Sequence, residues 1–100
     1  MSTRIDVPDA GLRQWCHRHA VRRLAFFGSV LRDDFSAQSD VDVLVEFEPG
    51  SRVGLIALAG MEISLSELLG RRTEIHTVKG LNPLFREEVL SSAEVHYEHA

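Results

Sequence analysis

The chain has 100 residues, which is the size of one domain, and its 44% hydrophobic and 26% charged residues are ordinary for a folded protein. Its net charge of −4 argues against direct binding of nucleic acid, because that binding depends on basic residues that neutralise phosphates. A single cysteine, Cys16, excludes an intrachain disulfide and a cysteine metal site, and the lack of a signal core or a long apolar run favours a cytoplasmic protein without membrane contact.

Hydrophobic periodicity and turn residues divide the chain into alternating helices and strands. Residues 1–8 are expected to form a flexible lead-in, and Asp9 is expected to cap the first helix, on whose apolar stripe Trp15 is a core residue. In chain order we expect a helix from residue 9, a strand over 22–27, a short helix over 30–35, a loop over 36–40, a strand over 41–47, a helix over 54–69, a strand over 73–78, a helix over 82–90 and a short strand over 95–97.

This order favours one α/β or α+β domain over residues 1–100, with a small sheet covered by helices. Two helix boundaries carry specific signals. Gly70 suits the end of the helix over 54–69, because a left-handed residue often ends a helix. Asn82 and Pro83 predict a helix start, with a capping side chain followed by proline at the first helical position. A chain of this length has little room for a separate substrate-binding domain. If it is an enzyme, a partner, a second copy or the substrate itself must complete the pocket.

The first candidate for chemistry is the pair Asp40 and Asp42, at the start of the strand expected over 41–47. Side chains two apart on a strand project from one face, so we expect both carboxylates on the same side. Two carboxylates suit Mg²⁺, which usually takes one or two protein carboxylates together with substrate phosphates. An isolated pair of this kind is more often a polar strand edge, but this pair lies where a valine-rich strand begins.

The second candidate is Gly28-Ser29, which follows directly after the strand expected over 22–27. Glycine lets the backbone approach a phosphate closely, and the free N–H groups at a helix start bind anions. A Gly-Ser pair alone is more often an ordinary turn and helix cap. Its combination with Asp40 and Asp42, which follow after ten intervening residues, is more specific than either part and predicts a site for a nucleotide and a metal.

Other polar residues have simpler interpretations. The five histidines show no metal-ligand spacing with a carboxylate motif, so a histidine metal site is not expected. The pairs Arg22-Arg23 and Arg71-Arg72 are candidates for holding a triphosphate or an acidic partner, with solvated pairs beside strands as the alternative. Tyr97, the only tyrosine, is a candidate for self-modification, with packing near the C-terminus as the favoured reading.

Residues 27–47, FGSVLRDDFSAQSDVDVLVEF, resemble the signature of the DNA polymerase β-type nucleotidyltransferase superfamily. They most resemble its short branch, the minimal nucleotidyltransferase (MNT) domains, which are often antitoxins encoded beside toxins with a HEPN domain. Residues 68–82, LLGRRTEIHTVKGLN, resemble the segment in which the family carries a third carboxylate on a later strand. The resemblance implies the nucleotidyltransferase fold, a small mixed sheet flanked by helices.

The resemblance also implies roles for the two motifs. Gly28 and Ser29 would hold the β- and γ-phosphates of a nucleotide, and Asp40 and Asp42 would be catalytic residues that ligate one or two Mg²⁺ ions bridging to the triphosphate. These roles match the ones predicted from residue chemistry alone.

Two further positions receive roles from the resemblance. Glu74 would be the third catalytic and metal-binding carboxylate, where the family more often has aspartate, and an exposed strand residue is the alternative. Arg32 would face the triphosphate or cap the acidic site, and a surface salt bridge is the alternative.

The implied activity is Mg²⁺-dependent transfer of AMP from ATP to a protein hydroxyl, typically a tyrosine of a HEPN toxin with which the antitoxin forms a hetero-oligomer. Two alternatives remain open at this stage. The chain would neutralise its toxin by direct binding with little or no catalysis, or it would be the catalytic half of an enzyme that modifies a small molecule such as an antibiotic.

Overall fold

A computed structural model describes residues 3 and 5–99 of the chain. The prediction of a flexible lead-in over residues 1–8 therefore falls partly outside the described residues. The described elements, in chain order, are α1 (Asp9–Arg18), β1 (Val21–Phe27), the 3₁₀ turn η1 (Gly28–Leu31), β2 (Val41–Phe47), α2 (Leu55–Leu69), β3 (Thr73–His76), α3 (Pro83–Ser92) and β4 (Glu94–Glu98). Within this part of the chain, no helix has the length and apolar character needed to span a membrane.

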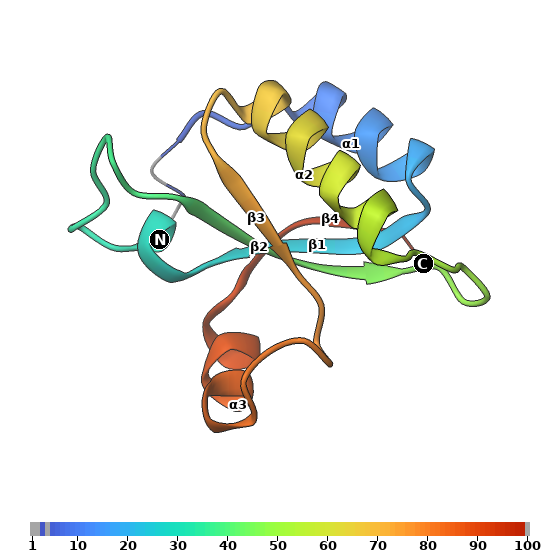
Figure 1. Ribbon diagram of the computed structural model, residues 1–100. Coiled ribbons are helices and arrows are strands. Elements are labelled where there is room, and N and C mark those ends of the chain that lie inside the picture. Colours follow the sequence, from blue (N-terminus) through green and yellow to red (C-terminus); the bar gives the residue numbers. More distant parts are fainter. Residues whose placement is uncertain (1–2, 4, 100) are drawn as a thin grey trace.

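The strands form one mixed sheet in the order β3-β2-β1-β4 (Figure 1). β1 pairs antiparallel with both β2 and β4, whereas β2 pairs parallel with β3. A parallel pair needs a crossover connection, and α2 supplies it between β2 and β3. The mixed sheet flanked by helices that the resemblance implied is confirmed.

The two faces of the sheet have different surroundings. Helices α1 and α2 lie side by side over one face, and α3 lies on the opposite side (Figure 1). Because side chains alternate along a strand, Val41, Val43 and Val45 of β2 enter the main core beneath α1 and α2. Leu44 points to the other face and joins a small cluster with Phe27 and Leu81 beside α3. Asp42 therefore projects from the face that α1 and α2 leave free.

Helix α1 is fixed to α2 through a buried polar contact. Trp15 is 4% exposed, as expected for a core residue, and its indole N–H donates to Ser64 Oγ at 2.9 Å. Cys16 lies beside it in the core, and burial raises the pKa of its thiol to about 12. The thiolate, which is the reactive form of cysteine, is therefore suppressed at neutral pH.

Two predicted boundaries are wrong in detail, and each has a local reason. Asp9 is not the cap of α1: Pro8 holds that position without a side-chain hydrogen bond, and Asp9 is the first helical residue. A carboxylate there still favours the positive end of the helix dipole. The helix expected over 30–35 is a 3₁₀ turn that ends at Leu31, because Arg32 adopts an extended backbone.

Other boundaries agree with the sequence signals. Gly70 ends α2 in the left-handed conformation with φ of 70°, and the Asn82 side chain accepts a hydrogen bond from the Leu84 N–H at 3.0 Å to begin α3. Strand β3 stops at His76, two residues earlier than expected, whereas β4 is longer than expected.

The core beneath α2 gives a stability prediction. Leu65 is fully buried in the main cluster, so Leu65→Ala is expected to lower the free energy of unfolding by about 2–5 kcal/mol. Ile63 on the same helix is 65% exposed, and Ile63→Ala is expected to change it by less than about 0.5 kcal/mol. Urea denaturation of the two variants measures both values, and equal losses would show that α2 packs through a different face.

Candidate functional site

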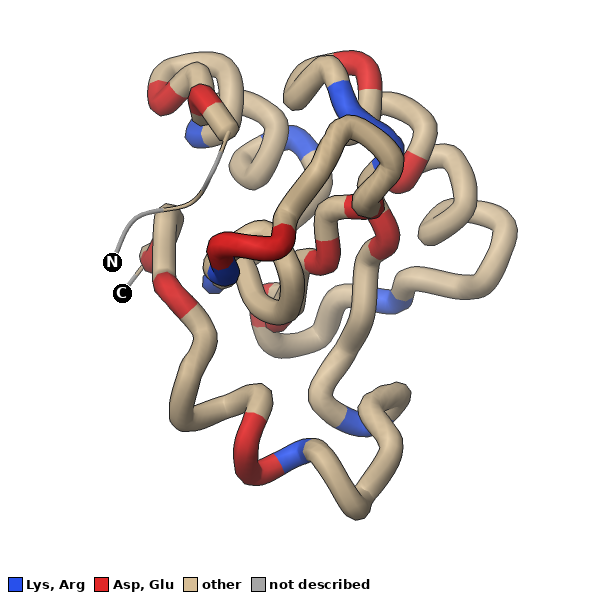
Figure 2. Tube along the Cα trace, turned by 90° about the vertical axis from the view of Figure 1, so that its left-hand side faces the viewer, with Lys and Arg blue, Asp and Glu red and all other residues tan. Residues whose placement is uncertain are grey.

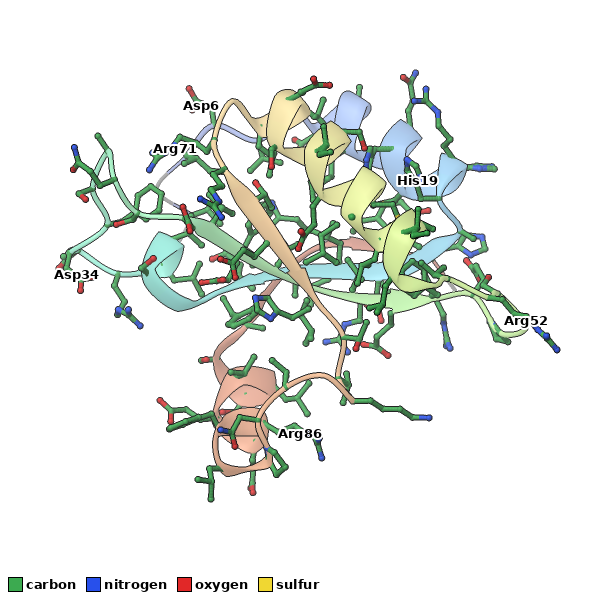
Figure 3. All side chains as sticks on the ribbon, viewed as in Figure 1. Asp6, His19, Asp34, Arg52, Arg71 and Arg86 are labelled. Atoms are coloured by element: carbon green, nitrogen blue, oxygen red, sulfur yellow. The ribbon has the colours of Figure 1, made fainter. Side chains whose placement is uncertain are left out.

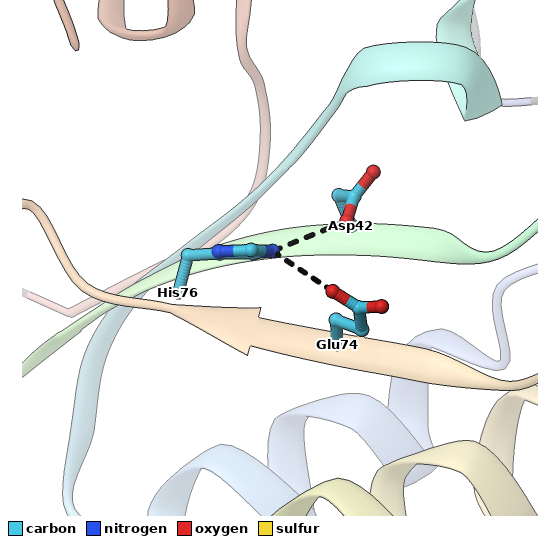
Figure 4. A group of neighbouring side chains, drawn as sticks. All are labelled: Asp42, Glu74 and His76. Carbon is cyan, nitrogen blue, oxygen red and sulfur yellow. Dashed lines mark hydrogen bonds and ion pairs between the residues drawn. The ribbon is translucent and has the colours of Figure 1, made fainter. Parts of the chain in front are cut away.

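Two carboxylates and one imidazole meet on the free face of the sheet. The parallel register of β2 and β3 places Glu74 opposite Asp42, and His76 follows two residues later on β3. His76 Nε2 lies 3.1 Å from Asp42 Oδ1 and 3.8 Å from Glu74 Oε2 (Figure 4). One ligand atom from each of the three side chains lies within 4.8 Å of the others. We refer to Asp42, Glu74 and His76 as the triad.

The triad attracts positive charge. The hydrogen bond with Asp42 raises the pKa of His76; burial of the ring opposes this shift, and the negative charges of Asp42, Glu74 and Glu62 add to it. The direction of the shift means that the carboxylates favour a proton on the ring. A cation between the same side chains would benefit from the same charges, because nearby opposite charges stabilise each other.

The chemistry of the donor set fits a divalent cation. Carboxylate oxygens are preferred ligands of Mg²⁺, which usually combines one or two of them with substrate phosphates and water. Asp42 and Glu74 supply two such groups from adjacent strands, and their side chains remain 28% and 45% exposed. The site is therefore open to a substrate that brings further oxygen ligands.

Asp40 lies outside the triad. It precedes β2, and its Oδ2 lies 4.0 Å from Arg72 Nε at a half-exposed position. The carboxylate that lies beside Asp42 in the triad is that of Glu74, 32 positions later in the chain. Asp40, two positions before Asp42, is not part of this group. The metal-binding role of Asp40 stays a prediction.

Gly28 lies directly against Asp42. Its φ is +78°, a left-handed backbone conformation that residues with a side chain rarely adopt. A Cβ atom added there would lie 3.1 Å from Asp42 Oδ2. Ser29 follows in the 3₁₀ turn, and its hydroxyl donates to the backbone oxygen of Asp40 at 3.4 Å. The two motifs predicted from the sequence are therefore adjacent in the fold. The helix start expected at Gly28-Ser29 is only a four-residue 3₁₀ turn.

A cleft of about 490 Å³ opens beside Gly28, between η1 and α3. Phe27, Phe85 and Val89 give it apolar walls, while Arg32 and Glu88 contribute charged groups. Arg32 also forms an ion pair with Asp34 at 3.3 Å, and both side chains are more than 60% exposed. Such exposed pairs contribute little stability, so this contact leaves Arg32 available to a ligand in the cleft.

The loop between η1 and β2 is held by Arg71, which points toward it from the turn between α2 and β3 (Figure 3). Its guanidinium donates to the backbone oxygens of Ser36 and Ser39 at 2.6 and 2.7 Å and lies 4.5 Å from the centre of the Phe35 ring. Figure 2 shows that the other Lys and Arg residues are distributed over the backbone trace. Arg71, a predicted candidate for triphosphate binding, thus has a structural role in this loop.

With this geometry in place, comparison with known proteins gives a family. The family of nucleotidyltransferase domains matches residues 10–96. The chain belongs to the nucleotidyltransferase domain family. Two proteins of Methanocaldococcus jannaschii, MJ0435 and MJ1217, both named as candidate protein adenylyltransferases, are 34% and 31% identical to it. The first match covers 76% of this chain and 80% of the relative, and the second covers 72% of each.

Solved structures agree with this assignment. A structure described as a candidate minimal nucleotidyltransferase is 39% identical, with a TM-score of 0.69 over 85% of both chains. A toxin–antitoxin structure with AMP-PNP shares the fold, with a TM-score of 0.74 at 13% identity over 92% of this chain and 74% of that one. The predicted membership among minimal nucleotidyltransferases is confirmed, and the chain is a nucleotidyltransferase enzyme.

Sequence reasoning about this nucleotidyltransferase missed His76. No local spacing connects His76 to the Asp40–Asp42 motif, so the sequence pattern around that motif does not predict this histidine. The useful signal was the two-residue spacing between Glu74 and His76, which places both on one face of a predicted strand. The pairing of that strand with Asp42 depends on sheet order, which the sequence did not reveal.

The Arg71 contacts give a prediction about the loop of the nucleotidyltransferase. Both hydrogen bonds come from Nη2 of Arg71, while the guanidinium carbon lies over the Phe35 ring. The ammonium of lysine has no planar group that can stack on Phe35 while it donates to the loop, so Arg71→Lys is expected to loosen the loop. We expect the amide proton of Ser39 to exchange about tenfold faster, which corresponds to a loss of about 1.4 kcal/mol. Arg72→Lys is the matched control, because the Arg72 side chain is 80% exposed. Equal exchange in both variants would contradict a special role for Arg71.

Proposed function

We propose that this nucleotidyltransferase transfers AMP from ATP to a hydroxyl group of a protein. The observation that carries the proposal is the approach of Asp42 and Glu74 on the free face of the sheet, beside the left-handed Gly28. The relatives named as candidate protein adenylyltransferases support this choice of donor and acceptor.

In the proposed mechanism, Asp42 and Glu74 would hold a divalent cation, for which we propose Mg²⁺, with Asp40 as an additional carboxylate. When bound, the cation stabilises the negative charge of the triphosphate. Gly28 lets the phosphates approach the backbone, and the weak 3.4 Å contact of the Ser29 hydroxyl leaves it available to donate to a phosphate oxygen. Arg32, at the edge of the adjoining cleft, adds positive charge.

The chemical step exchanges a phosphoanhydride bond of ATP for a phosphoester bond to the acceptor. The acceptor oxygen bonds to the α-phosphorus, the bond from that phosphorus to the bridging oxygen of the β-phosphate breaks, and pyrophosphate leaves with the electron pair. Glu74, the more exposed of the two carboxylates, accepts the proton of the attacking hydroxyl.

Exposed apolar side chains near the cleft favour a protein as the acceptor over an antibiotic. Leu84 and Phe85 at the start of α3 are 86% and 56% exposed, and Phe85 also lines the cleft beside Gly28. Contiguous exposed apolar surface commonly marks a protein contact, whereas a small polar substrate needs an enclosing pocket. The acceptor would dock against α3 and present its hydroxyl to the triad.

We propose a cytoplasmic antitoxin role, with a tyrosine of a HEPN toxin as the acceptor in a hetero-oligomer. The toxin–antitoxin structure solved with AMP-PNP has the same fold, which supports a toxin and an adenine nucleotide as partners. The second candidate function is neutralisation by binding alone. Glu74, where aspartate is more usual in the family, is the observation that favours it.

Intact-mass spectrometry of the toxin separates these functions. After incubation with the nucleotidyltransferase, ATP and Mg²⁺, we expect the toxin to gain the mass of one or more AMP units. Asp42→Asn should abolish the gain, while Glu74→Asp should keep it, because the carboxylate remains. A stable complex with no mass gain would support neutralisation by binding.

A further inference from the structure

The third member of the triad distinguishes this site from one built only of carboxylates. We propose that His76 is a direct metal ligand and that it raises the affinity of the site for divalent transition-metal ions more than its affinity for Mg²⁺. This proposal deepens the metal-binding role of Asp42 and Glu74 proposed above and rests on it.

The spacing of the donor atoms fits a shared cation. Ligand atoms that are about 2.1 Å from one ion lie roughly 3.0–3.4 Å from each other in octahedral or tetrahedral geometry. His76 Nε2 lies 3.1 Å from Asp42 Oδ1 and 3.8 Å from Glu74 Oε2 (Figure 4). The three ligand atoms lie within 4.8 Å of one another, which is wider than this range, so Glu74, whose side chain is 45% exposed, would have to turn inward to close the set.

The imidazole is held in position by its surroundings. His76 lies at the end of β3, inside the sheet register, and its ring meets the Phe27 ring edge-on at 5.2 Å between centroids. Phe27 is almost fully buried and immediately precedes Gly28. A ligand supported by packing costs less entropy to order than a free surface histidine, which favours metal binding at this position.

The chemistry of the imidazole gives the selectivity. Mg²⁺ is a hard ion that takes oxygen ligands, whereas imidazole nitrogen suits first-row transition ions such as Co²⁺, Ni²⁺ and Zn²⁺. A site with two carboxylates and one imidazole therefore gains affinity for a transition ion from His76 and gains little for Mg²⁺. The alternative is that His76 only positions Asp42 through their hydrogen bond.

His76→Gln distinguishes a ligand from a positioning residue. The glutamine amide can still donate to Asp42 but is a poor ligand for a transition ion. We would titrate the full chain with Co²⁺ and, separately, with Mg²⁺ by calorimetry, and record the visible absorption of the bound Co²⁺. We expect His76→Gln to weaken Co²⁺ binding by at least about tenfold and Mg²⁺ binding by less than about twofold.

The controls make each outcome decisive. His99→Gln removes an exposed histidine that pairs with Glu48 at 3.0 Å, and it should leave Co²⁺ binding unchanged. Asp42→Asn should weaken the binding of both Co²⁺ and Mg²⁺. Unfolding midpoints would confirm that each variant is folded. Unchanged Co²⁺ affinity in His76→Gln would overturn the proposal, as would equal losses for Co²⁺ and Mg²⁺. The titrations contain neither ATP nor an acceptor, so failure of AMP transfer would not affect their result.

Discussion

Asp42→Asn is expected to reduce AMP transfer by on the order of 10³-fold, because a bound cation contributes several kcal/mol of charge stabilisation and each 1.36 kcal/mol changes a rate tenfold. Asp42 is the residue that faces Glu74 across β2 and β3, contacts His76 and lies against Gly28. Asparagine keeps the size of the side chain and removes the charge that would hold the proposed cation. The rate of pyrophosphate release in a single turnover measures the loss.

The matched control for this variant is Asp9→Asn. Asp9 is exposed in the first turn of α1, a helix that covers the opposite face of the sheet from the triad. Asp9→Asn changes the net charge by the same amount as Asp42→Asn. Because Asp9 is exposed and lies on the other side of the sheet from the triad, we expect a rate within about twofold of the original. If both variants were equally slow, general electrostatics rather than a metal site at Asp42 would explain the loss.

Gly28→Ala is expected to abolish most of the activity and to lower the free energy of unfolding by about 1–2 kcal/mol. The backbone cost arises because alanine is strained at a φ of +78°. The functional cost arises because the new methyl group would lie 3.1 Å from Asp42 Oδ2 and would push the carboxylate from its position. Urea denaturation and single-turnover rates measure the two effects separately.

Gly50→Ala separates backbone strain from contact with the site. Gly50 has a φ of +86°, and no heavy atom lies within 4 Å of an added Cβ. We therefore expect a similar loss of stability with nearly full activity. Equal activity in the Gly28 and Gly50 variants would mean that close approach to Asp42 is not required for transfer.

The sequence was informative where structure is determined locally. The valine alternation predicted the bounds of β2 correctly, and Gly70 and Asn82 correctly marked the end of α2 and the start of α3. These features depend on side-chain periodicity and on capping contacts between near neighbours. The family resemblance extended this reasoning to the mixed sheet and to Glu74 as the partner of the Asp42 motif.

Features set by contacts between distant residues were not predictable in the same way. The parallel register that joins Glu74 to Asp42 depends on the crossover through α2, and no local pattern specifies it. The helix expected over 30–35 does not form, because Phe35 packs under Arg71 and the loop oxygens of Ser36 and Ser39 bond to the same guanidinium. Tertiary contacts there override the local preference for helix.

The position of the transferred phosphorus distinguishes nucleotidyl transfer by this chain from any other use of ATP. We would incubate the nucleotidyltransferase and the toxin proposed as its acceptor with ATP radiolabelled at either the α- or the γ-phosphate. We expect the α label to stay on the toxin and the γ label to leave in pyrophosphate. Transfer of the γ label, or of neither label, would contradict this expectation.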